Sequence, residues 1–371
     1  MAANGWTDDL LDRMRGTGDP LGDAAIAETY ELGQQEQVRQ ALLGFGRNSD
    51  AVPEGLPPKL QRYFEATAEL PAWADREQMA RGHELLGRYQ PLIASILLCG
   101  SLPLCYTCGN GAEVLARSQR LTSGVYRRLA ETSQFVVDVL DEDGLGPTGH
   151  GLRSAQKIRL LHATMRYHVS QLGDWDAAAL GVPVNQEDLA GTLMSFSVLI
   201  PQGLAKLGVE LLPEDRDAYF HIWRVVGHVL GVHEQLDLVK FGDGAALKDT
   251  IIRRQQRPSE AGTALTKGVL DFIKEVLPVL PGAGPTLIRH LIGDASADVV
   301  KVPPASSLTR LGLTAATLPS FGYGKAGDTL PPAAKAASQL GLLAFKEGLL
   351  LTNKGRRREW QVPTGLADSS S

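Results

Sequence analysis

The sequence predicts an all-α protein. Hydrophobic residues recur with the period of a helix over nearly all of the first 300 residues, and no segment shows the sustained alternation typical of strands. The composition, 43% hydrophobic and 21% charged, is ordinary for a globular protein with a sizeable core. The length of 371 residues allows either two domains or one large helical domain.

The helical period divides the chain into ten stretches. We expect helices near residues 22–44, 58–68, 75–89, 92–106, 111–141 (with a break), 152–171, 186–208, 215–232, 245–257 and 262–278. Two helix starts are legible, because Asp75 in "LPAWADREQ" and Asn185 in "VNQEDLAGTL" are residue types that cap helix N-termini. We interpret "NQED", residues 185–188, chiefly as such a helix start.

Composition also suggests how the chain is divided. We expect an N-terminal segment (1–20), a main helical domain (21–303), small helices or loops packed on it (304–360) and a disordered tail (361–371). The last boundaries follow from a change after residue 303, where proline, glycine and small residues become frequent. The segment "GYGKAG", Gly322 to Gly327, lies in this part and lacks the strand and helix that a dinucleotide-binding loop needs.

Charge and the N-terminus narrow the function classes. The net charge is −5 with acids and bases mixed along the chain, so we expect no nucleic-acid partner. The N-terminus "MAANGWTDDLLDRMRG" predicts an acidic helix and lacks the apolar core of a signal peptide, which favours a cytoplasmic protein. Cys99, Cys105 and Cys108 are too few for a disulfide framework, so we expect them to be structural.

One stretch could be mistaken for a membrane span. From Tyr89 to Ala112 no charged residue occurs, which is long enough to cross a bilayer. Pro91, Gly100 and Pro103 interrupt it, so we expect a buried helix pair instead.

The spacing of the histidines bears on two kinds of metal site. None of the eight histidines has a glutamate three residues before it, so the Glu-x-x-His pattern of di-iron helical proteins is absent. His221 and His228 are seven residues apart and share a helix face with Arg224, so a ligand pair is conceivable, although core or surface histidines are the favoured interpretation.

A different histidine lies at the edge of a core-facing stripe. In "KIRLLHATMRYH" and the residue that follows it, Ile158, Leu161, Met165 and Val169 form an apolar stripe, and His162 lies on its rim. One interpretation is a structural core histidine. The other is a haem ligand, in which case a neighbouring arginine, Arg159 or Arg166, could pair with the propionates.

A second helix offers polar side chains beside its apolar stripe. In "VYRRLAETSQFVVDVL" these are Arg128, Glu131 and Thr132, which need partners if they are buried. They form either a structural network among themselves or the polar part of a pocket that handles dioxygen. The glycine-rich "DEDGLGPTGHG" would let this helix pack antiparallel against the helix of His162.

Several segments in order resemble one family. They are "RYFEATAELPAWAD", "ETSQFVVDVL", "GLRSAQKIRLLHATMRYH", "WDAAALGVPVNQEDLAGTLMSFSV" and "GLAKLGVELLPEDRDAYFHIWRVVGHVLGV". Over roughly residues 20 to 300 the chain resembles the superfamily of rubber oxygenases (latex-clearing proteins) and the ER-bound oxygenase of mycophenolic acid biosynthesis. The resemblance implies a globin-like helical core with additional helices, binding one non-covalent haem b, and so a haem-binding domain over residues 21–303.

The resemblance also implies a ligand. In rubber oxygenases the proximal histidine follows the threonine of an R-x-x-x-T motif by about thirty residues; here Arg128 and Thr132 match the motif and His162 matches the ligand. His168 is the alternative ligand.

Two positions depart from the family pattern or match it only loosely. Rubber-cleaving members have a lysine before the threonine that can bind the iron on the distal side, whereas this chain has Glu131, so any distal cap differs. Those members also have an active-site glutamate, for which Glu113 is the nearest candidate here.

We therefore expect a haem b-dependent oxygenase that uses O2 on a hydrophobic, isoprenoid- or lipid-like substrate. Arg128 and Thr132 would shape the distal pocket, and Glu113 or Glu131 would move a proton. Because no signal peptide is evident, polyisoprene is not the expected substrate. The alternatives are a non-catalytic haem sensor or carrier, and a structural helical protein without cofactor. The substrate, the type of oxidation, the reductant and the oligomeric state stay open.

Overall fold

The computed structural model describes residues 6–117, 125–171, 173–276 and 282–305, with only the backbone of residues 125–130 and 276. Within these ranges every regular element is a helix, and the one β-type pairing is an isolated bridge between Cys108 and Gln256. The all-α prediction is confirmed. The expectations for 304–360 and 361–371, including the GYGKAG loop, fall almost wholly outside the described residues.

The helices follow one another along the chain with short connections. They are α1 (Asp8–Arg15), α2 (Pro20–Glu31), α3 (Gln35–Ala41), α4 (Pro58–Ala66), α5 (Arg76–Ile96), the π-helical turn η1 (Leu97–Ser101), α6 (Leu102–Tyr106), α7 (Gly109–Arg117), α8 (Val125–Leu140), α9 (Gly151–Gln171), α10 (Ala177–Leu180), α11 (Gln186–Ser197), α12 (Leu199–Lys206), α13 (Pro213–Val229), the 3-10 turn η2 (Glu234–Leu236), α14 (Phe241–Gln255), α15 (Glu260–Val276), α16 (Ala283–Ile292) and α17 (Asp294–Val299).

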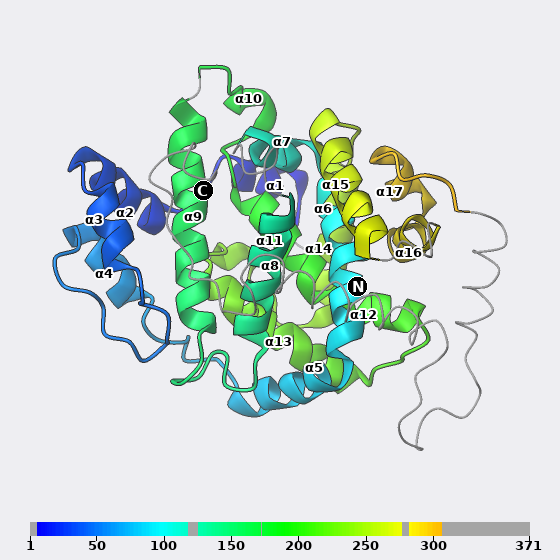
Figure 1. The fold of residues 1–371 in the computed structure, drawn as a ribbon, viewed down its shortest axis with the longest axis horizontal. Helices are drawn as coiled ribbons and strands as arrows, with labels where there is room; N and C mark the ends of the chain where they lie inside the picture. The colour runs from blue at the N-terminus through cyan, green and yellow to red at the C-terminus, as the bar shows by residue number, and fades with distance from the viewer. Residues whose placement is uncertain (1–5, 118–124, 172, 277–281, 306–371) are drawn as a thin grey trace.

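Helix α9 runs through the molecule (Figure 1) and contributes buried residues to two hydrophobic clusters. On one side, α2, α3 and α4 pack against it around the smaller cluster. On the other side, α5, α8, α11 and α13 enclose the larger cluster, and α15 to α17 lie at the far end. This arrangement leaves α9 buried along most of its length, so its polar side chains must find partners on both sides.

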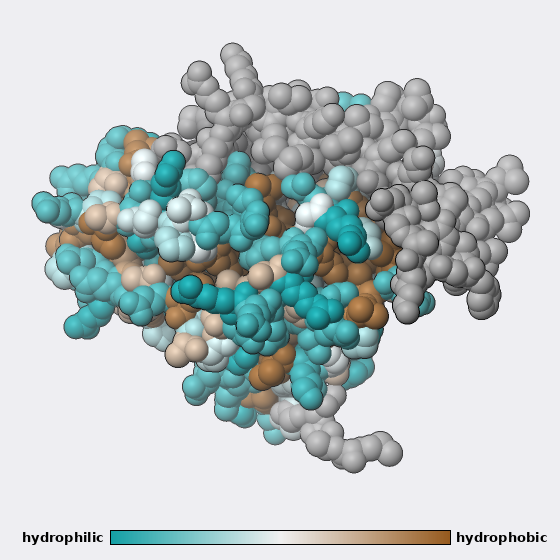
Figure 2. All heavy atoms as spheres, turned by 90° about the horizontal axis from the view of Figure 1, so that it is seen from below, coloured by the Kyte–Doolittle hydropathy of each residue, from teal (hydrophilic) through white to brown (hydrophobic). Residues whose placement is uncertain are grey.

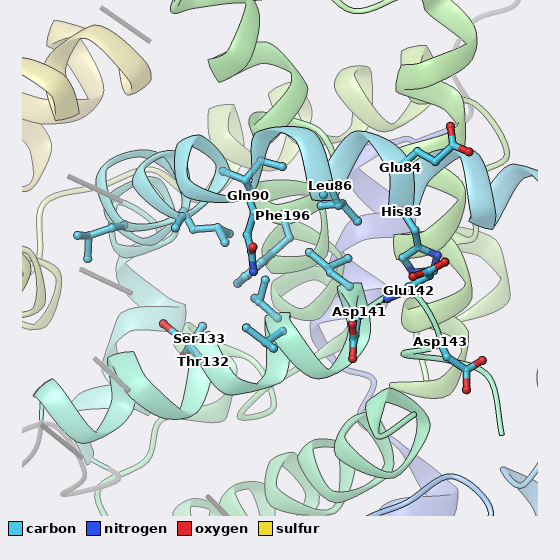
Figure 3. A pocket seen from close by; sticks show the side chains of 18 of the residues that line it. His83, Glu84, Leu86, Gln90, Thr132, Ser133, Asp141, Glu142, Asp143 and Phe196 are labelled. Atoms are coloured by element: carbon cyan, nitrogen blue, oxygen red, sulfur yellow. Dashed lines mark hydrogen bonds between the residues drawn. The ribbon is translucent and has the colours of Figure 1, made fainter. Parts of the chain in front are cut away.

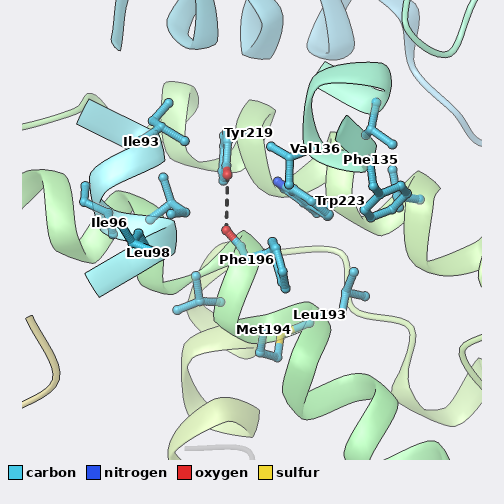
Figure 4. Close-up of a cluster of buried hydrophobic side chains, with 14 of the residues drawn as sticks. Ile93, Ile96, Leu98, Phe135, Val136, Leu193, Met194, Phe196, Tyr219 and Trp223 are labelled. Atoms are coloured by element: carbon cyan, nitrogen blue, oxygen red, sulfur yellow. Dashed lines mark hydrogen bonds between the residues drawn. The ribbon is translucent and has the colours of Figure 1, made fainter. Parts of the chain in front are cut away.

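Aromatic side chains of α13 fill the centre of the larger cluster. Tyr219 and Trp223 are at most 1% exposed, and the Phe196 and Trp223 ring centroids are 5.1 Å apart. The Tyr219 hydroxyl donates to the Phe196 carbonyl oxygen at 3.2 Å (Figure 4). Rings of this size contribute more buried apolar area than any other residue type, so they hold α11 and α13 together.

The uncharged stretch continues α5 as far as Tyr106 without the expected break, and its last residues begin α7 at Gly109. Asp75 caps α5, accepting from the backbone N–H of Glu77 at 2.9 Å and of Gln78 at 3.1 Å, as expected. No break occurs at Pro91; the irregular turn is η1, just before Pro103, whose missing N–H removes one helical donor. By length and composition, the run Arg76–Tyr106 could cross a membrane, but 61% of its most apolar window is buried in the protein.

Other boundaries differ where backbone geometry intervenes. The expected helix 22–44 is divided at Gly33, whose φ of +64° is left-handed and ends the helix. The expected helix 186–208 is divided at Val198, between α11 and α12. Helices α16 and α17 were not expected, and the predicted N-terminal helix is α1.

The "NQED" segment does more than begin α11. Asn185 caps the helix as expected, accepting from the Asp188 N–H at 2.9 Å. Glu187 is fully buried and accepts hydrogen bonds from Arg15 at 3.2 Å, from Arg254 at 2.8 Å and from the Gln255 amide at 2.8 Å. This carboxylate therefore joins α1, α11 and α14.

The outer surface is mostly hydrophilic on the face that α5 presents (Figure 2). Hydrophobic residues show there only between polar ones. Among the described residues, four large hydrophobic side chains are exposed: Leu32, Leu43, Leu212 and Val239.

Candidate active site

A cavity of about 270 Å³ lies between α8 and α9, with α6, α7, α11, α13 and α14 completing its walls. The walls are mainly aliphatic and aromatic. They include Phe135, Leu161, Met165, Leu193, Phe196 and Trp223. Such a cavity, apolar with few polar groups, is typical of a binding site for a hydrophobic ligand.

His162 reaches this cavity from α9. Ile158, Leu161 and Met165 line the same cavity, so the apolar stripe that the sequence showed faces it. Opposite, α8 contributes Glu131 and Thr132, both half-buried. The structure thus brings together three of the residues selected from the sequence: His162, Glu131 and Thr132.

The two arginines that flank His162 do not line the cavity. Arg159 donates two hydrogen bonds to the buried Asp19 carboxylate, at 2.6 and 2.7 Å, and one to the Val229 carbonyl at 3.1 Å. Arg166 donates to Asp23 at 2.6 Å and to the Val184 carbonyl at 3.0 Å. Both guanidinium groups therefore fix α2 to α9, and the structure does not bring them to the cavity as expected for propionate partners.

The remaining predicted residues lie elsewhere. The His168 Nε2 is 2.7 Å from the Tyr30 hydroxyl at the α2–α9 contact, outside the cavity. Glu113 lies half-buried on α7, whose Gly111, Val114 and Leu115 face the cavity while Glu113 does not. The backbone of Arg128 belongs to α8, but its side chain is outside the described residues.

His221 and His228 have structural roles at the α5–α13 contact. His221 Nε2 accepts a hydrogen bond from the Asp75 backbone N–H at 2.9 Å. The Trp73 ring lies edge-on to both imidazoles and is also covered by the Arg224 guanidinium, 3.7 Å from its centroid. The two histidines are therefore packing residues, as favoured from the sequence.

Sequence reasoning missed two charged side chains in the cavity wall. Asp188 accepts from Arg15 at 3.1 Å and from the Asn185 amide at 2.8 Å, while burial raises the pKa of its carboxyl. Lys248 of α14 lies in the wall and pairs with Asp249 at 2.8 Å. Asp188 was noticed only as part of a helix cap, and no pattern distinguishes Lys248 from other lysines.

An open groove of about 940 Å³ adjoins the cavity. It runs between α5 and α8 (Figure 3). Three residues, Leu102, Thr132 and Phe196, line both spaces. These shared residues form the wall between the groove and the cavity of His162.

Comparison with known proteins supports one family. Residues 90–344 match the family described as "ER-bound oxygenase mpaB/B'/Rubber oxygenase, catalytic domain". The chain is 25% identical over 378 residues to a rubber oxygenase of Streptomyces sp. (strain K30), an alignment that covers 96% of this chain and 90% of that protein.

A solved structure shows the same fold. It is a latex clearing protein in the closed state, with a TM-score of 0.80 and 24% sequence identity, covering 94% of this chain and 95% of that one. The matched family region includes α8, α9 and α11, which supply most of the cavity wall. The chain therefore belongs to the oxygenase family that comprises the rubber oxygenases and the ER-bound oxygenases mpaB/B′.

Proposed function

We propose that this protein is a haem b-dependent oxygenase, with His162 as the iron ligand, that uses O2 on a hydrophobic, isoprenoid- or lipid-like substrate. The observation that carries the proposal is the imidazole of His162 in the wall of an otherwise apolar cavity. The apolar walls of the cavity would cover the macrocycle of haem b, and the imidazole of His162 would serve as the side-chain ligand that its iron requires.

The side chains of the cavity that could bind iron fit a haem group. Among the described lining residues His162 is the only histidine, and a neutral imidazole is a common haem ligand. Burial raises the pKa of the Cys108 thiol, which keeps it protonated and a poor ligand. The Asp188 carboxylate is already held by Arg15 and Asn185. In the described part of the chain, no three His, Cys, Asp or Glu side chains form a group that could hold a bare metal ion.

The bound haem would supply dioxygen binding and activation, and the protein controls what surrounds it. Leu193, Phe196 and Trp223 exclude water from the reacting region. The Thr132 hydroxyl can donate a hydrogen bond into the cavity, and the Glu131 carboxylate can accept or return a proton there. With a carboxylate at position 131, this chain lacks the lysine that caps the iron in its rubber-cleaving relatives, so Glu131 is better suited to moving protons than to binding iron.

The propionates need a cation other than those expected. Arg159 and Arg166 are committed to Asp19 and Asp23. Lys248 is the lysine in the described part of the cavity wall, and its partner Asp249 is largely exposed, so exchanging this partner for a propionate costs little.

The test is oxygen uptake by protein produced with a haem precursor. With a reductant and a C15–C20 isoprenoid, we expect substrate-dependent uptake and incorporation of label from ¹⁸O2 into the product. His162→Ala should abolish both, whereas His168→Ala should retain them. Haem-loaded protein that consumes no O2 with any isoprenoid or lipid offered would instead support a sensor or carrier and contradict the oxygenase.

A further inference from the structure

The groove between α5 and α8 has two chemically different ends (Figure 3). Towards the His162 cavity it is lined by apolar residues such as Leu98, Leu102, Val136 and Phe196. The lining at the other end includes four acidic residues, Glu84, Asp141, Glu142 and Asp143 (Figure 3). No lysine or arginine is found among the residues that the structure describes as its lining. The groove is therefore amphipathic along its length, with a negatively charged end.

A buried imidazole marks the acidic end. His83, from α5, is only 9% exposed, and its Nε2 has no hydrogen-bond partner within the described part of the chain. Asp141 and Glu142 line the same end of the groove as His83. Burial lowers the pKa of His83, while backbone hydrogen bonds with Val139 and Met79 and the charges of Asp141 and Glu142 raise it. A buried polar atom without a partner is costly, so His83 Nε2 is suited to a hydrogen bond with a bound molecule.

The acidic groups here are accessible in different degrees. The Asp143 carboxylate accepts hydrogen bonds from the Thr148 backbone N–H, at 2.8 Å, and from its hydroxyl, so this carboxylate is occupied. Glu142 is exposed and forms no ion pair among the described residues. Its carboxylate, which can only accept hydrogen bonds, is available to a molecule bound at this end of the groove.

The geometry gives the groove a direction. Thr132 belongs to the wall shared with the His162 cavity, and Asp141 follows the last residue of α8. Eight residues of α8 lie between them, so the two positions are about 14 Å apart along the helix axis. A linear molecule lying in the groove therefore has one end at the acidic group of residues and the other at the wall of the cavity.

We propose that this groove binds a lipid-like substrate whose polar head donates hydrogen bonds and carries no negative charge. The head, an alcohol or an amine, lies at His83 and Glu142, and the apolar tail extends towards Thr132. This orientation presents the tail to the His162 cavity, so oxidation occurs on the tail, remote from the head. The site of oxidation rests on the proposed function, whereas the preference for the head group does not.

The charge at the acidic end sets the selectivity. A carboxylate or phosphate head placed beside Glu142 and Asp141 would meet like charges, with no described cation in the lining to offset them. An ammonium head gains from the same charges, and a hydroxyl donates without an electrostatic cost. For equal tails we expect an anionic head to bind at least about tenfold more weakly than either.

The experiment is calorimetric titration of the haem-loaded protein, without reductant, with decanol, decylamine and decanoate. The variants are Glu142→Gln, His83→Phe and, as a control, Glu54→Gln, an exposed acid outside the groove. We expect decanol and decylamine to bind and decanoate to be at least about tenfold weaker. Glu142→Gln should weaken the binding of decylamine and strengthen that of decanoate. His83→Phe should weaken the binding of decanol, and Glu54→Gln should change the affinity for none of the three ligands.

The proposal is overturned if decanoate binds as tightly as decanol, or if Glu142→Gln alters the preference no more than Glu54→Gln does. Should His83→Phe fail to fold, the exposed position 142 still decides the matter. The titration involves no turnover, so its outcome is independent of oxygen uptake. Head selectivity without oxygen uptake would contradict the oxygenase alone, and uptake without head selectivity would contradict the groove alone.

Discussion

The Arg159 guanidinium and the Asp19 carboxylate form a two-point ion pair, with N–O distances of 2.6 and 2.7 Å, between α9 and the start of α2. Both residues are at least 91% buried. The guanidinium also donates to the Val229 carbonyl at the end of α13, so one side chain links three helices. This explains why α9 carries an arginine beside its apolar stripe without assigning that arginine to a cofactor.

Removing the partner of this buried charge should be strongly destabilising. Asp19→Asn leaves Arg159 charged and uncompensated, and we expect a loss of about 3 kcal/mol in the free energy of unfolding. Glu36→Gln is the matched control, because Glu36 also accepts two hydrogen bonds from one arginine, Arg39, but its side chain is 61% exposed, so we expect a much smaller loss. Urea denaturation measures both; equal effects would show that burial does not set the strength of the pair.

A similar argument applies to Glu187, which has no exposed side-chain surface and accepts from Arg15, Arg254 and Gln255. Glu187→Gln should lower the free energy of unfolding by about 3 kcal/mol, because two partly buried guanidinium groups lose their shared carboxylate. The pair Lys267–Asp271, by contrast, is exposed, so Asp271→Asn should change the free energy of unfolding by less than about 0.5 kcal/mol. A Glu187 variant as stable as the Asp271 variant would contradict the role of Glu187 in joining α1, α11 and α14.

His221 should make stability depend on pH. Burial, with the nearby Arg224, lowers the pKa of His221 in the folded protein below its ordinary value of 6.5, and its Nε2 accepts a hydrogen bond that a protonated ring cannot accept. As the pH falls through 6.5, the unfolded state binds this proton more readily, so the folded state loses stability.

Melting temperatures between pH 8 and pH 5 measure this effect. We expect a fall below pH 6.5 that His221→Gln reduces, since glutamine keeps an acceptor but does not titrate. His83, His168 and His228, whose pKa values burial also lowers, should leave a residual slope. His290→Gln is the control, and an identical slope in the His221 and His290 variants would refute the explanation.

The cysteines should be unreactive in the folded protein. Cys99 is fully buried, burial raises the pKa of the Cys99 and Cys108 thiols, and none of the three cysteines forms a disulfide. We expect slow labelling by a thiol reagent at neutral pH and labelling of all three in denaturant. Rapid modification of Cys99 in native protein, located by peptide mass spectrometry, would be incompatible with the described packing.

The sequence predicted most helices because their apolar periodicity is strong, and it predicted the caps at Asp75 and Asn185 because capping depends on local chemistry. The prediction failed where contacts between distant parts of the chain determine the partner of a side chain. Periodicity placed Arg159 near His162 on the same helix, but not the Asp19 carboxylate, 140 residues away along the chain, that binds it.

In the cavity, too, local patterns were predicted from the sequence and tertiary contacts were not. The stripe through Ile158 and Met165 placed His162 at an apolar border, and the structure confirms that all three line one space. Lys248 and Asp188 enter that space from helices distant in sequence, and the partnerless nitrogen of His83 appears only once α5 and α8 are packed together.

On the function proposed above, His162 is present in order to hold iron. The most direct test is the visible spectrum of protein made with a haem precursor, recorded oxidised, reduced with dithionite and carbonyl-bound, for the wild type, His162→Ala and His168→Ala. If His162 binds the iron, we expect a Soret band that shifts on reduction, persists in His168→Ala and is lost in a folded His162→Ala. A wild-type spectrum in His162→Ala, or a folded and colourless wild type, would contradict this role of His162.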